Sequence, residues 1–381
     1  MKIGVTSTDY PIKRNIIGKV SDAEYLVLRK NNNFYHSLST IIKLLLRKKE
    51  NFDGKYYYWQ KPKLDVLHLY NQVNYSSQKW VTSFETLVPR FDETKNDHQK
   101  ENPSHQKNNK TEQALQQICK SNCLGIISIS KASADIQNEL LKNYPKYEEI
   151  IQKKLHIIHP AQELLPENKR KFDNLENGLT LIFVGTQFHL KGGVEMVEVL
   201  KTLKKHYNFK LIIISSFKTD NYVTHVTKEE AEKTREELEK EDWIEVYQNI
   251  PNEKVLSLIK DSHIGLLPTW SDTYGFSVLE MQAAGVPVIT TDIRALPEIN
   301  NNQCGWLIHL PQNRLKQALY FNKDQKEELR ETLKIQLEDI LVRVFDNKDI
   351  LKEKSKAAIE RIEEEHNPVK VKEKLLKIYN Q

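Results

Sequence analysis

The sequence predicts an α/β protein with two doubly wound parallel sheets. Short apolar runs rich in Val, Ile and Leu alternate with helical patterns along both halves of the 381-residue chain, as buried parallel strands and their crossover helices do. A polar stretch, 163–177, contains Pro166 and separates two halves of ordinary domain size. We therefore expect a first domain at 1–162, a linker at 163–177, a second domain at 178–365 and a separate final segment, 366–381.

In the first half, the periodicity of apolar residues predicts five strands and three helices. A helical spacing of Ala23, Leu26 and Val27 begins at Ser21. The segment 92–113 is almost free of apolar residues, so we expect a long mobile polar loop there. The expected strands are 2–7, 64–70, 80–84, 124–130 and 155–158, and the later helices are 36–49 and 132–141.

The second half repeats the alternation and ends in a charged helical tail. This tail begins at Lys323, and Asn367-Pro368 predicts a break within it. Gly285 suits a left-handed residue after a helix. The expected strands are 179–185, 209–215, 243–247, 264–267 and 287–289, and the expected helices are 194–206, 228–241, 252–259 and 276–284.

Composition narrows the classes of protein. No apolar run reaches the ~18 residues of a membrane span, and the first residues resemble a strand rather than a signal peptide. Three cysteines are too few for a disulfide framework, which favours a reducing cytoplasm. Cys119 and Cys123 are four apart on an expected helix, but no histidine pair accompanies them, so we expect no metal site.

The formal net charge is +5, and positive charge is concentrated at the start of the chain. Residues 1–50 contain ten Lys or Arg and four Asp or Glu. Two interpretations of the basic helix at 36–49 remain open: a helix packed on a sheet with a solvated basic face, or a patch that rests on an anionic membrane. We expect no nucleic-acid binding, because the basic residues lack interleaved aromatic residues and known motifs.

One candidate phosphate site is Lys191-Gly192-Gly193, where an expected strand gives way to a helix. A cation at a helix N-terminus opposes the helix dipole. The placement is easier to understand if an anion binds between the Lys191 ammonium and the amides of Gly192 and Gly193. The alternative is a surface lysine beside a glycine turn. The second glycine and the Ser/Thr of a Walker loop are absent.

The second candidate is the motif 271–289. An expected helix begins after Gly275, and a helix N-terminus offers free amides to a phosphate. Asp272 and Glu280 flank this helix start. Two carboxylates beside a phosphate site can accept hydrogen bonds from hydroxyl groups of the same ligand, which indicates a sugar nucleotide. The alternative is that Asp272 caps the helix and Glu280 lies on the surface.

These residues resemble the family 4 glycosyltransferases of GT-B architecture over about 179–308. The resemblance rests on five stretches in addition to Lys191-Gly192-Gly193. They are Phe183-Val184-Gly185, Asp272 through Tyr274-Gly275-Phe276 to Glu280, Gly285-Val286-Pro287-Val288-Ile289, and Leu296-Pro297-Glu298 with Gly305-Trp306-Leu307. The resemblance implies two Rossmann-like domains with the donor in a cleft and a final helix, within 366–381, that returns to the first domain.

The resemblance also implies roles for individual residues. Lys191 and the amides around Gly275-Phe276-Ser277 would contact the donor diphosphate, Glu280 the ribose and Asp272 the donor sugar. The donor-binding set is completed by Gly185, Thr186, Gly192 and Tyr274. Thr186 stands where the family usually has an arginine, and Phe84-Glu85 stands where it has a histidine. We assign Gly18, Lys19 and Glu85 to the acceptor side.

The sequence therefore predicts a retaining glycosyltransferase. It would move a hexose-type sugar from a nucleoside diphosphate, a UDP- or GDP-sugar, to an acceptor hydroxyl on a glycan or lipid-linked acceptor. The setting would be polysaccharide, glycolipid or other surface glycoconjugate synthesis, in the cytoplasm or at the inner face of the membrane. No cofactor or metal is expected. The alternatives are a nucleotide-sugar isomerase or hydrolase of the same fold and a non-catalytic nucleotide-sugar-binding protein.

Overall fold

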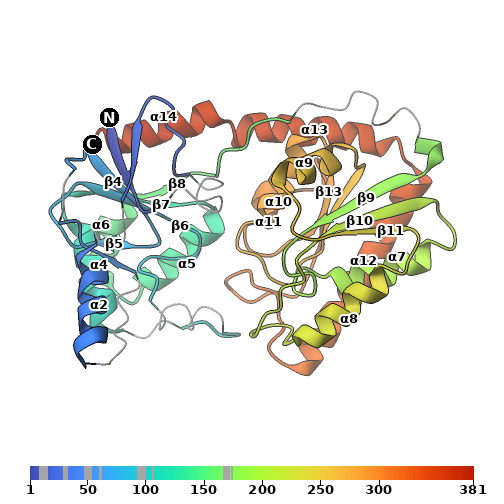
Figure 1. The fold of residues 1–381 in the computed structure, drawn as a ribbon, viewed down its shortest axis with the longest axis horizontal. Coiled ribbons are helices and arrows are strands. Elements are labelled where there is room, and N and C mark those ends of the chain that lie inside the picture. Colours follow the sequence, from blue (N-terminus) through green and yellow to red (C-terminus); the bar gives the residue numbers. More distant parts are fainter. Residues whose placement is uncertain are drawn as a thin grey trace. The chain divides into compact units, whose positions relative to one another are not determined.

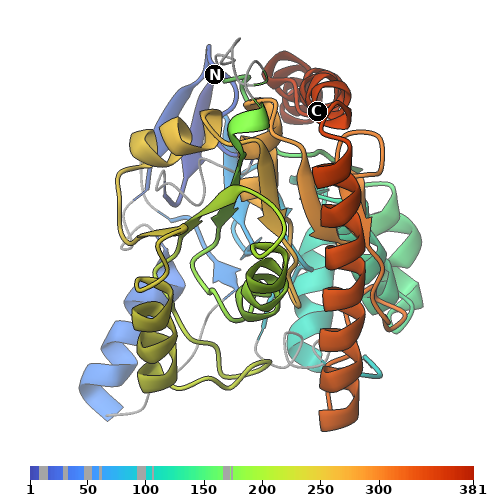
Figure 2. The same cartoon turned by 90° about the vertical axis from the view of Figure 1, so that its right-hand side faces the viewer.

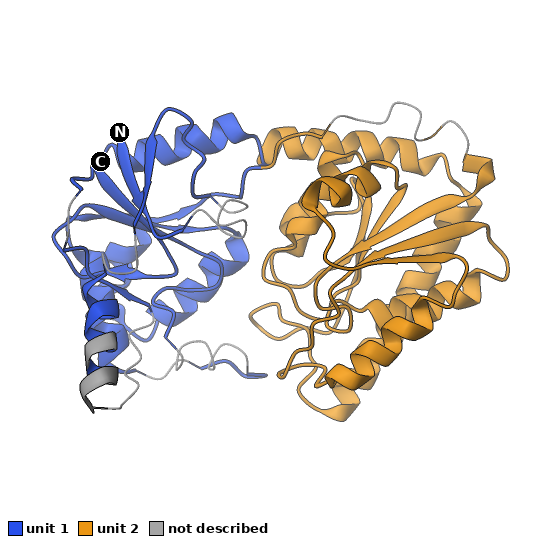
Figure 3. Cartoon of the chain, in the orientation of Figure 1, with its two compact units in different colours: residues 1–161, 366–381 blue, residues 162–365 orange. Residues whose placement is uncertain are grey.

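The chain forms two compact units in the computed structural model (Figure 3). Unit 1 comprises Met1–Ala161 and His366–Gln381, and unit 2 comprises Gln162–Glu365. The final segment therefore belongs to unit 1, and the described residues of the expected linker belong to unit 2. The structure describes residues 1–7, 16–28, 33–46, 54–59, 62–91, 100–104, 107–165, 172 and 175–381.

Unit 1 contains a parallel six-stranded sheet in the order β2-β1-β4-β6-β7-β8 (Figure 1). Its strands are β1 (Lys2–Val5), β2 (Glu24–Val27), β4 (Val66–Tyr70), β6 (Trp80–Phe84), β7 (Cys123–Ser128) and β8 (Leu155–Ile157). A two-stranded parallel pair is made by β3 (Lys55–Tyr56) and β5 (Val73–Asn74). The helices are α2 (Phe34–Leu46), α4 (Asn109–Cys119), α5 (Lys131–Leu141), α6 (Pro145–Gln152) and α14 (Pro368–Tyr379).

Three sequence-based expectations for unit 1 are wrong. The segment after Ser21 is the strand β2, because Glu24–Val27 pairs in parallel register with β1. The end of the expected polar loop is helical, since α4 begins at Asn109 and the Asn108 side chain caps it. Cys119 and Cys123 do not share a helix, because α4 ends at the first and β7 begins at the second.

Other parts of the expected loop and of the basic segment lie outside the described residues. These are 92–99 and 105–106 of the loop and 47–49 of the segment 36–49. The described part of that segment lies in α2.

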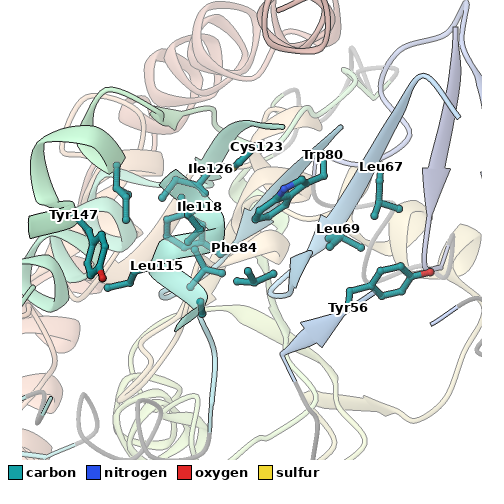
Figure 4. Close-up of a cluster of buried hydrophobic side chains, with 14 of the residues drawn as sticks. Tyr56, Leu67, Leu69, Trp80, Phe84, Leu115, Ile118, Cys123, Ile126 and Tyr147 are labelled. Carbon is teal, nitrogen blue, oxygen red and sulfur yellow. The ribbon is translucent and has the colours of Figure 1, made fainter. Parts of the chain in front are cut away.

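The core of unit 1 fills the space between the sheet and the helices α4 and α6 (Figure 4). Trp80 and Phe84 of β6 and Leu67 and Leu69 of β4 are fully buried in it, together with Leu115 of α4. Alternate residues of β4 and β6 supply these side chains because successive residues of a strand point to opposite faces.

Unit 2 contains a second parallel six-stranded sheet, in the order β11-β10-β9-β12-β13-β14. Its strands are β9 (Leu179–Val184), β10 (Phe209–Ile214), β11 (Ile244–Tyr247), β12 (Ile264–Leu267), β13 (Val288–Thr291) and β14 (Trp306–Ile308). Counted from β9, this is the 3-2-1-4-5-6 order of a Rossmann fold. The order reverses between β9 and β12, and ligands of such sheets bind beyond the carboxyl ends of the strands at that point.

Helices cover both faces of the second sheet. They are α7 (Gly193–Leu203), α8 (Lys228–Leu238), α9 (Asn252–Lys260), α10 (Phe276–Ala283), α11 (Leu296–Ile299), α12 (Lys323–Asp346) and α13 (Ile350–Glu365). The long helix α12 packs along α7, while α10 packs against α13 and α9 (Figure 2). Strands therefore alternate with helices as the sequence predicts.

The last helix, α14, is fixed to unit 1 by polar contacts as well as by apolar packing. Its N-cap is Asn367, at the predicted break, and the Asn367 side chain accepts from the amide of Val369 at 2.8 Å. At its other end, a hydrogen bond of 2.6 Å joins the Tyr379 hydroxyl to Nδ1 of the buried His68. The ammonium of Lys372 bonds Ser21 Oγ at 3.0 Å. Among the helices that the structure describes, none is long and apolar enough to cross a membrane.

Candidate active site

Lys191 and Asp272 meet at the point where the strand order of unit 2 reverses. Lys191 lies in the loop after β9, and Asp272 lies in the loop after β12. The Lys191 ammonium donates to Asp272 Oδ2 at 2.7 Å and to the carbonyl oxygen of Ser271 at 2.8 Å. Each side chain of the pair is only 15% exposed. The two motifs predicted as separate half-sites therefore form one charged centre.

Glycines hold the Lys191 loop against its neighbours. A Cβ at Gly185 would stand 3.2 Å from Cγ of Lys191, so this glycine leaves room for the lysine stem. Gly192 has a φ of +73°, and a Cβ there would lie 1.9 Å from the carbonyl oxygen of Pro268. A side chain at Gly192 would thus separate the two loops that carry Lys191 and Asp272.

The Gly192 and Gly193 amides, which the sequence analysis assigned to an anion, have acceptors within their own turn. The Gly192 amide donates to the His189 carbonyl at 3.1 Å, and the Gly193 amide donates to the Phe188 carbonyl at 3.0 Å. Both N–H groups are therefore used inside the turn. The Lys191 ammonium gives this loop a positive charge that can attract an anion.

Asp272 is held as a carboxylate. Burial acts to raise its pKa, but the charge and hydrogen bond of Lys191 and the amides of Tyr274 and Thr273 outweigh burial, so the pKa lies below its ordinary value. The Tyr274 amide donates to Asp272 Oδ1 at 3.0 Å. Asp272 does not cap α10, whose N-cap is Gly275. The capping alternative is therefore wrong.

The helix α10 begins beside this pair. Gly275 is left-handed, with a φ of +91°, and the first turn contains Phe276 and Ser277. Amides of a first helical turn have no intrahelical acceptor. One turn further, the Glu280 side chain is buried, with 7% of the residue exposed, so the alternative of a surface residue is wrong. Tyr274 is 1% exposed, so its ring belongs to the core and only its backbone can face a ligand.

The sequence analysis missed a group of hydroxyls around Ser271. The Ser271 side chain lies near the phenols of Tyr222 and Tyr320 and acts to lower the pKa of both. Burial raises the pKa of Tyr222 to about 12, so this phenol keeps its proton. Burial raises the pKa of Tyr320, and the positive charge of the buried Arg294 nearby partly offsets this rise. These four residues come from four loops, each of which follows a strand of the second sheet, a position that could have singled them out from the strand predictions.

Thr186, at the position of the family's arginine, is exposed. Its carbonyl oxygen accepts from the Lys218 amide at 2.9 Å, which ties the loop after β9 to the loop after β10. The Thr186 side chain adds no positive charge beside Lys191.

The residues assigned to the acceptor side all lie in unit 1. Gly18 and Lys19 are in the connection after β1, and Gly18 is exposed with a φ of +83°. Glu85 directly follows β6, where its Oε2 accepts from the Tyr70 hydroxyl at 2.9 Å and its Oε1 pairs with Arg90. Within the described parts of the chain, His, Cys, Asp and Glu form no group of three arranged to hold a metal ion.

Comparison with known sequences places most of this site in a known family region. Residues 166–337 match the family described as "Glycosyl transferases group 1", and this region contains Lys191, Asp272 and Glu280. A capsular polysaccharide biosynthesis glycosyltransferase of Staphylococcus aureus, CapM, is 26% identical over 143 residues. That alignment covers 35% of this chain and 33% of CapM, so the chain matches about a third of the curated relative. These matches support a glycosyltransferase.

Solved structures resemble the whole chain. A glycosyltransferase from Rickettsia africae has a TM-score of 0.60 at 15% identity, covering 100% of this chain and 97% of its own. The Anabaena protein Alr3699/HepE, in complex with UDP-glucose, has a TM-score of 0.60 at 9% identity, covering 100% of this chain and 99% of its own. The fold is GT-B. The prediction of two Rossmann-like domains with parallel sheets is therefore confirmed.

Proposed function

We propose that the protein is a retaining glycosyltransferase of family 4 that moves a sugar from a nucleoside diphosphate to an acceptor hydroxyl. The observation that carries the proposal is the buried Lys191–Asp272 pair at the reversal point of the second sheet. A lysine ammonium held beside a helix N-terminus, with carboxylates at hand, suits a ligand that is anionic at one end and rich in hydroxyls at the other. A nucleotide sugar has this composition.

In the proposed reaction, Lys191 exchanges its carboxylate partner for the donor diphosphate. The bond between the anomeric carbon and the phosphate oxygen breaks, and its electron pair goes to that oxygen. Lys191 and the first-turn amides of α10 stabilise the charge that develops there. The same phosphate oxygen takes the proton of the acceptor hydroxyl, which attacks from the side that the diphosphate leaves. The configuration of the sugar is thereby retained.

The two carboxylates hold the donor at its two ends in this proposal. Asp272, once released from Lys191, binds a hydroxyl of the transferred sugar, and Glu280 binds the ribose. Both are carboxylates in or beside the first turns of α10, and hydrogen bonds from hydroxyls to a charged acceptor are strong. No step requires a cofactor or a metal ion.

The proposed donor is a UDP- or GDP-sugar, and the proposed acceptor is a glycan or a lipid-linked saccharide used in capsule or other surface polysaccharide synthesis. Two comparisons support this setting: the capsular role in the name of CapM and the UDP-glucose bound to HepE. We place the reaction on the cytoplasmic side of the membrane, where nucleotide sugars are made.

The test is Lys191→Met, with sugar transfer and UDP affinity as the readouts. We expect transfer to fall by at least about a hundredfold, the scale of losing one stabilising group in a transition state. Lys201→Met is the matched control. Lys201 lies in α7, the helix that follows the Lys191 loop, and it also forms an ion pair, with Glu241 at 2.8 Å. Near-normal transfer by Lys191→Met would overturn the assignment.

Lys191→Met leaves the buried Asp272 carboxylate without its partner, so loss of activity through unfolding must be separated from loss of chemistry. The double variant Lys191→Met/Asp272→Asn removes both charges and keeps the shapes. It should melt close to the wild type and remain inactive.

Incubation with donor alone separates transfer from the isomerase or hydrolase alternative, since fast conversion without acceptor would contradict transfer.

A further inference from the structure

A second partly buried ion pair lies in unit 1, between Glu85 and Arg90. The two side chains are 23% and 29% exposed, so the pair is shielded but within reach of a ligand. Tyr70 is the last residue of β4, Glu85 directly follows β6, and these two strands are parallel neighbours. The Glu85 carboxylate therefore lies at the carboxyl ends of strands, where open α/β sheets bind their ligands.

The fold holds Glu85 in place independently of Arg90. The Tyr70 hydroxyl donates to Oε2 of Glu85 at 2.9 Å, and the Ser133 hydroxyl, at the start of α5, donates to the Glu85 carbonyl oxygen. Burial and the neighbouring Glu85 charge raise the pKa of Tyr70, so the phenol keeps its proton and remains a donor. The Glu85 carboxylate thus retains a hydrogen-bond partner if the guanidinium turns to another anion.

The Arg90 guanidinium has donors that Glu85 does not use. Its Nη1 bonds Oε1 of Glu85, and a guanidinium carries several further N–H donors. The Arg90 Nε is buried and has no hydrogen-bond acceptor in the part of the chain that the structure describes. Buried polar atoms are almost always paired in proteins, so this unused donor calls for an explanation.

Asn71 places an unused acceptor beside the same group. It directly follows β4, and its side chain acts on the pKa of Tyr70, so it lies near the phenol. The Asn71 Oδ1 atom is buried and finds no donor among the described residues. The Asn71 backbone is left-handed, with a φ of +56°, a conformation that non-glycine residues adopt mainly where function requires it.

The pair repeats in unit 1 the charge pattern of Lys191 and Asp272 in unit 2. In each unit, a carboxylate in the loop after a strand holds a partly buried cation. The cation of unit 1 is a guanidinium, whose planar fork matches the two oxygens of a carboxylate or a phosphate. The Arg90 site is therefore suited to an oxyanion that has a hydroxyl group nearby.

We propose that Arg90 binds an anionic group of the acceptor, a carboxylate or a phosphate, in exchange for Glu85. Asn71 Oδ1 accepts from an acceptor hydroxyl beside that group, while Glu85 stays bonded to the Tyr70 phenol. A uronic acid in a glycan carries such a carboxylate, and a lipid-linked saccharide carries such a phosphate. The proposal rests on the proposed function, because it names the class of acceptor for that transfer. The alternative is an ion pair that only fixes the loop after β6.

The test measures the binding of three small probes to the full chain by saturation-transfer NMR. The probes are methyl glucuronide, glycerol 3-phosphate and the neutral methyl glucoside. The chain carries Lys191→Met/Asp272→Asn, so that the cation of unit 2 does not contribute. We expect binding of at least one charged probe and none of the glucoside. Binding of the glucuronide alone supports an acidic glycan as acceptor, and binding of the phosphate alone supports a phosphorylated acceptor.

Variants of the pair separate a binding role from a structural one. In the same background, Arg90→Met should weaken binding at least about tenfold, the scale of one hydrogen bond to a charged group. Glu85→Gln should strengthen binding, because it removes the competing carboxylate. Glu85→Gln/Arg90→Met removes both charges, so it should melt close to its parent and still fail to bind. Arg343→Met is the matched control, because Arg343 pairs with Asp339 at 2.6 Å on α12 of unit 2 and should not affect binding.

The proposal is overturned if neither charged probe binds, if the glucoside binds equally well, or if Arg90→Met binds the charged probes as its parent does. UDP affinity is a property of unit 2 and should be unchanged by Arg90→Met in the otherwise native chain. Failure at Arg90 is therefore distinguishable from failure of the proposed function, which Lys191→Met tests.

Discussion

The stability of unit 1 should depend on the protonation of one buried histidine. His68 of β4 has no exposed surface, and its two ring nitrogens bond the Tyr379 hydroxyl at 2.6 Å and Ser83 Oγ at 3.2 Å. Burial lowers the pKa of His68 from its ordinary 6.5 to about 3. The folded protein therefore excludes a proton that the unfolded chain accepts.

The sign and size of the effect follow from this pKa. Between pH 6.5 and about 3 the unfolded state binds the extra proton, so the free energy of unfolding falls as the pH falls. Each pKa unit is worth about 1.4 kcal/mol, so the full window amounts to about 5 kcal/mol, and the loss at about pH 5 is about 2 kcal/mol. Above pH 6.5 the contribution is complete and constant.

Hydrogen exchange of peptides from β4, β6 and α14 is the suitable assay, because it reports on unit 1 alone. His68→Gln keeps a polar side chain and cannot titrate, so its exchange should lack this pH dependence. Relative to the variant at the same pH, opening of the wild type should become about thirtyfold easier between about pH 8 and about pH 5. His36→Gln, at an exposed position of α2, is the control and should behave like the wild type. Equal pH dependence in wild type and His68→Gln would refute the reasoning.

Two further predictions concern unit 2. Gly192→Ala places a Cβ 1.9 Å from the Pro268 carbonyl oxygen at a φ of +73°, so its melting temperature should fall by more than the ~2–4 °C that 1 kcal/mol is worth in a domain of this size. Gly18→Ala has a φ of +83° but no neighbour within 4 Å, so it should cost less, and an equal fall would contradict the close-approach argument. Asp272→Asn removes the carboxylate that competes for Lys191, so calorimetry should show tighter UDP binding, and this gain should vanish in a Lys191→Met background. A gain of the same size without the lysine would show that Asp272 acts by general repulsion instead.

The second sheet was predictable because its strands are continuous apolar runs. Buried parallel strands such as Leu179–Val184 and Ile264–Leu267 leave that pattern in the sequence. The edge strand β2 has a different sequence pattern. Its spacing of Ala23, Leu26 and Val27 resembles a helix, and only pairing with β1, formed by residues more than twenty positions earlier, decides its conformation. Tertiary pairing of that kind is invisible to local periodicity.

The candidate site was predictable in its charges but not in its glycines. Lys191 and Asp272 follow two strands that the fold brings side by side, so the order of elements was enough to join them. A Lys-Gly-Gly sequence, however, is equally compatible with amides that bind a ligand and with glycines that allow close approach. A Cβ at Gly192 would meet the Pro268 carbonyl oxygen, and both glycine amides have acceptors within the turn. The structure therefore favours the second interpretation, in which the glycines allow the two loops to approach closely. Tyr222, Tyr320 and Arg294, which lie around Ser271, are in loops for which the sequence offered no motif.

The return of α14 to unit 1 has a consequence for the order in which the protein is made. Residues 162–365, all of unit 2, leave the ribosome before residues 366–381, which complete unit 1. Until Tyr379 has been synthesised, the His68 ring lacks this hydrogen-bond partner, and the part of the unit 1 sheet that α14 contacts is uncovered. The donor-side unit, which is continuous in sequence, can finish folding first, although domains usually fold in order from the N-terminus. During synthesis the part of the unit 1 sheet that α14 contacts is therefore the surface that a chaperone would need to shield.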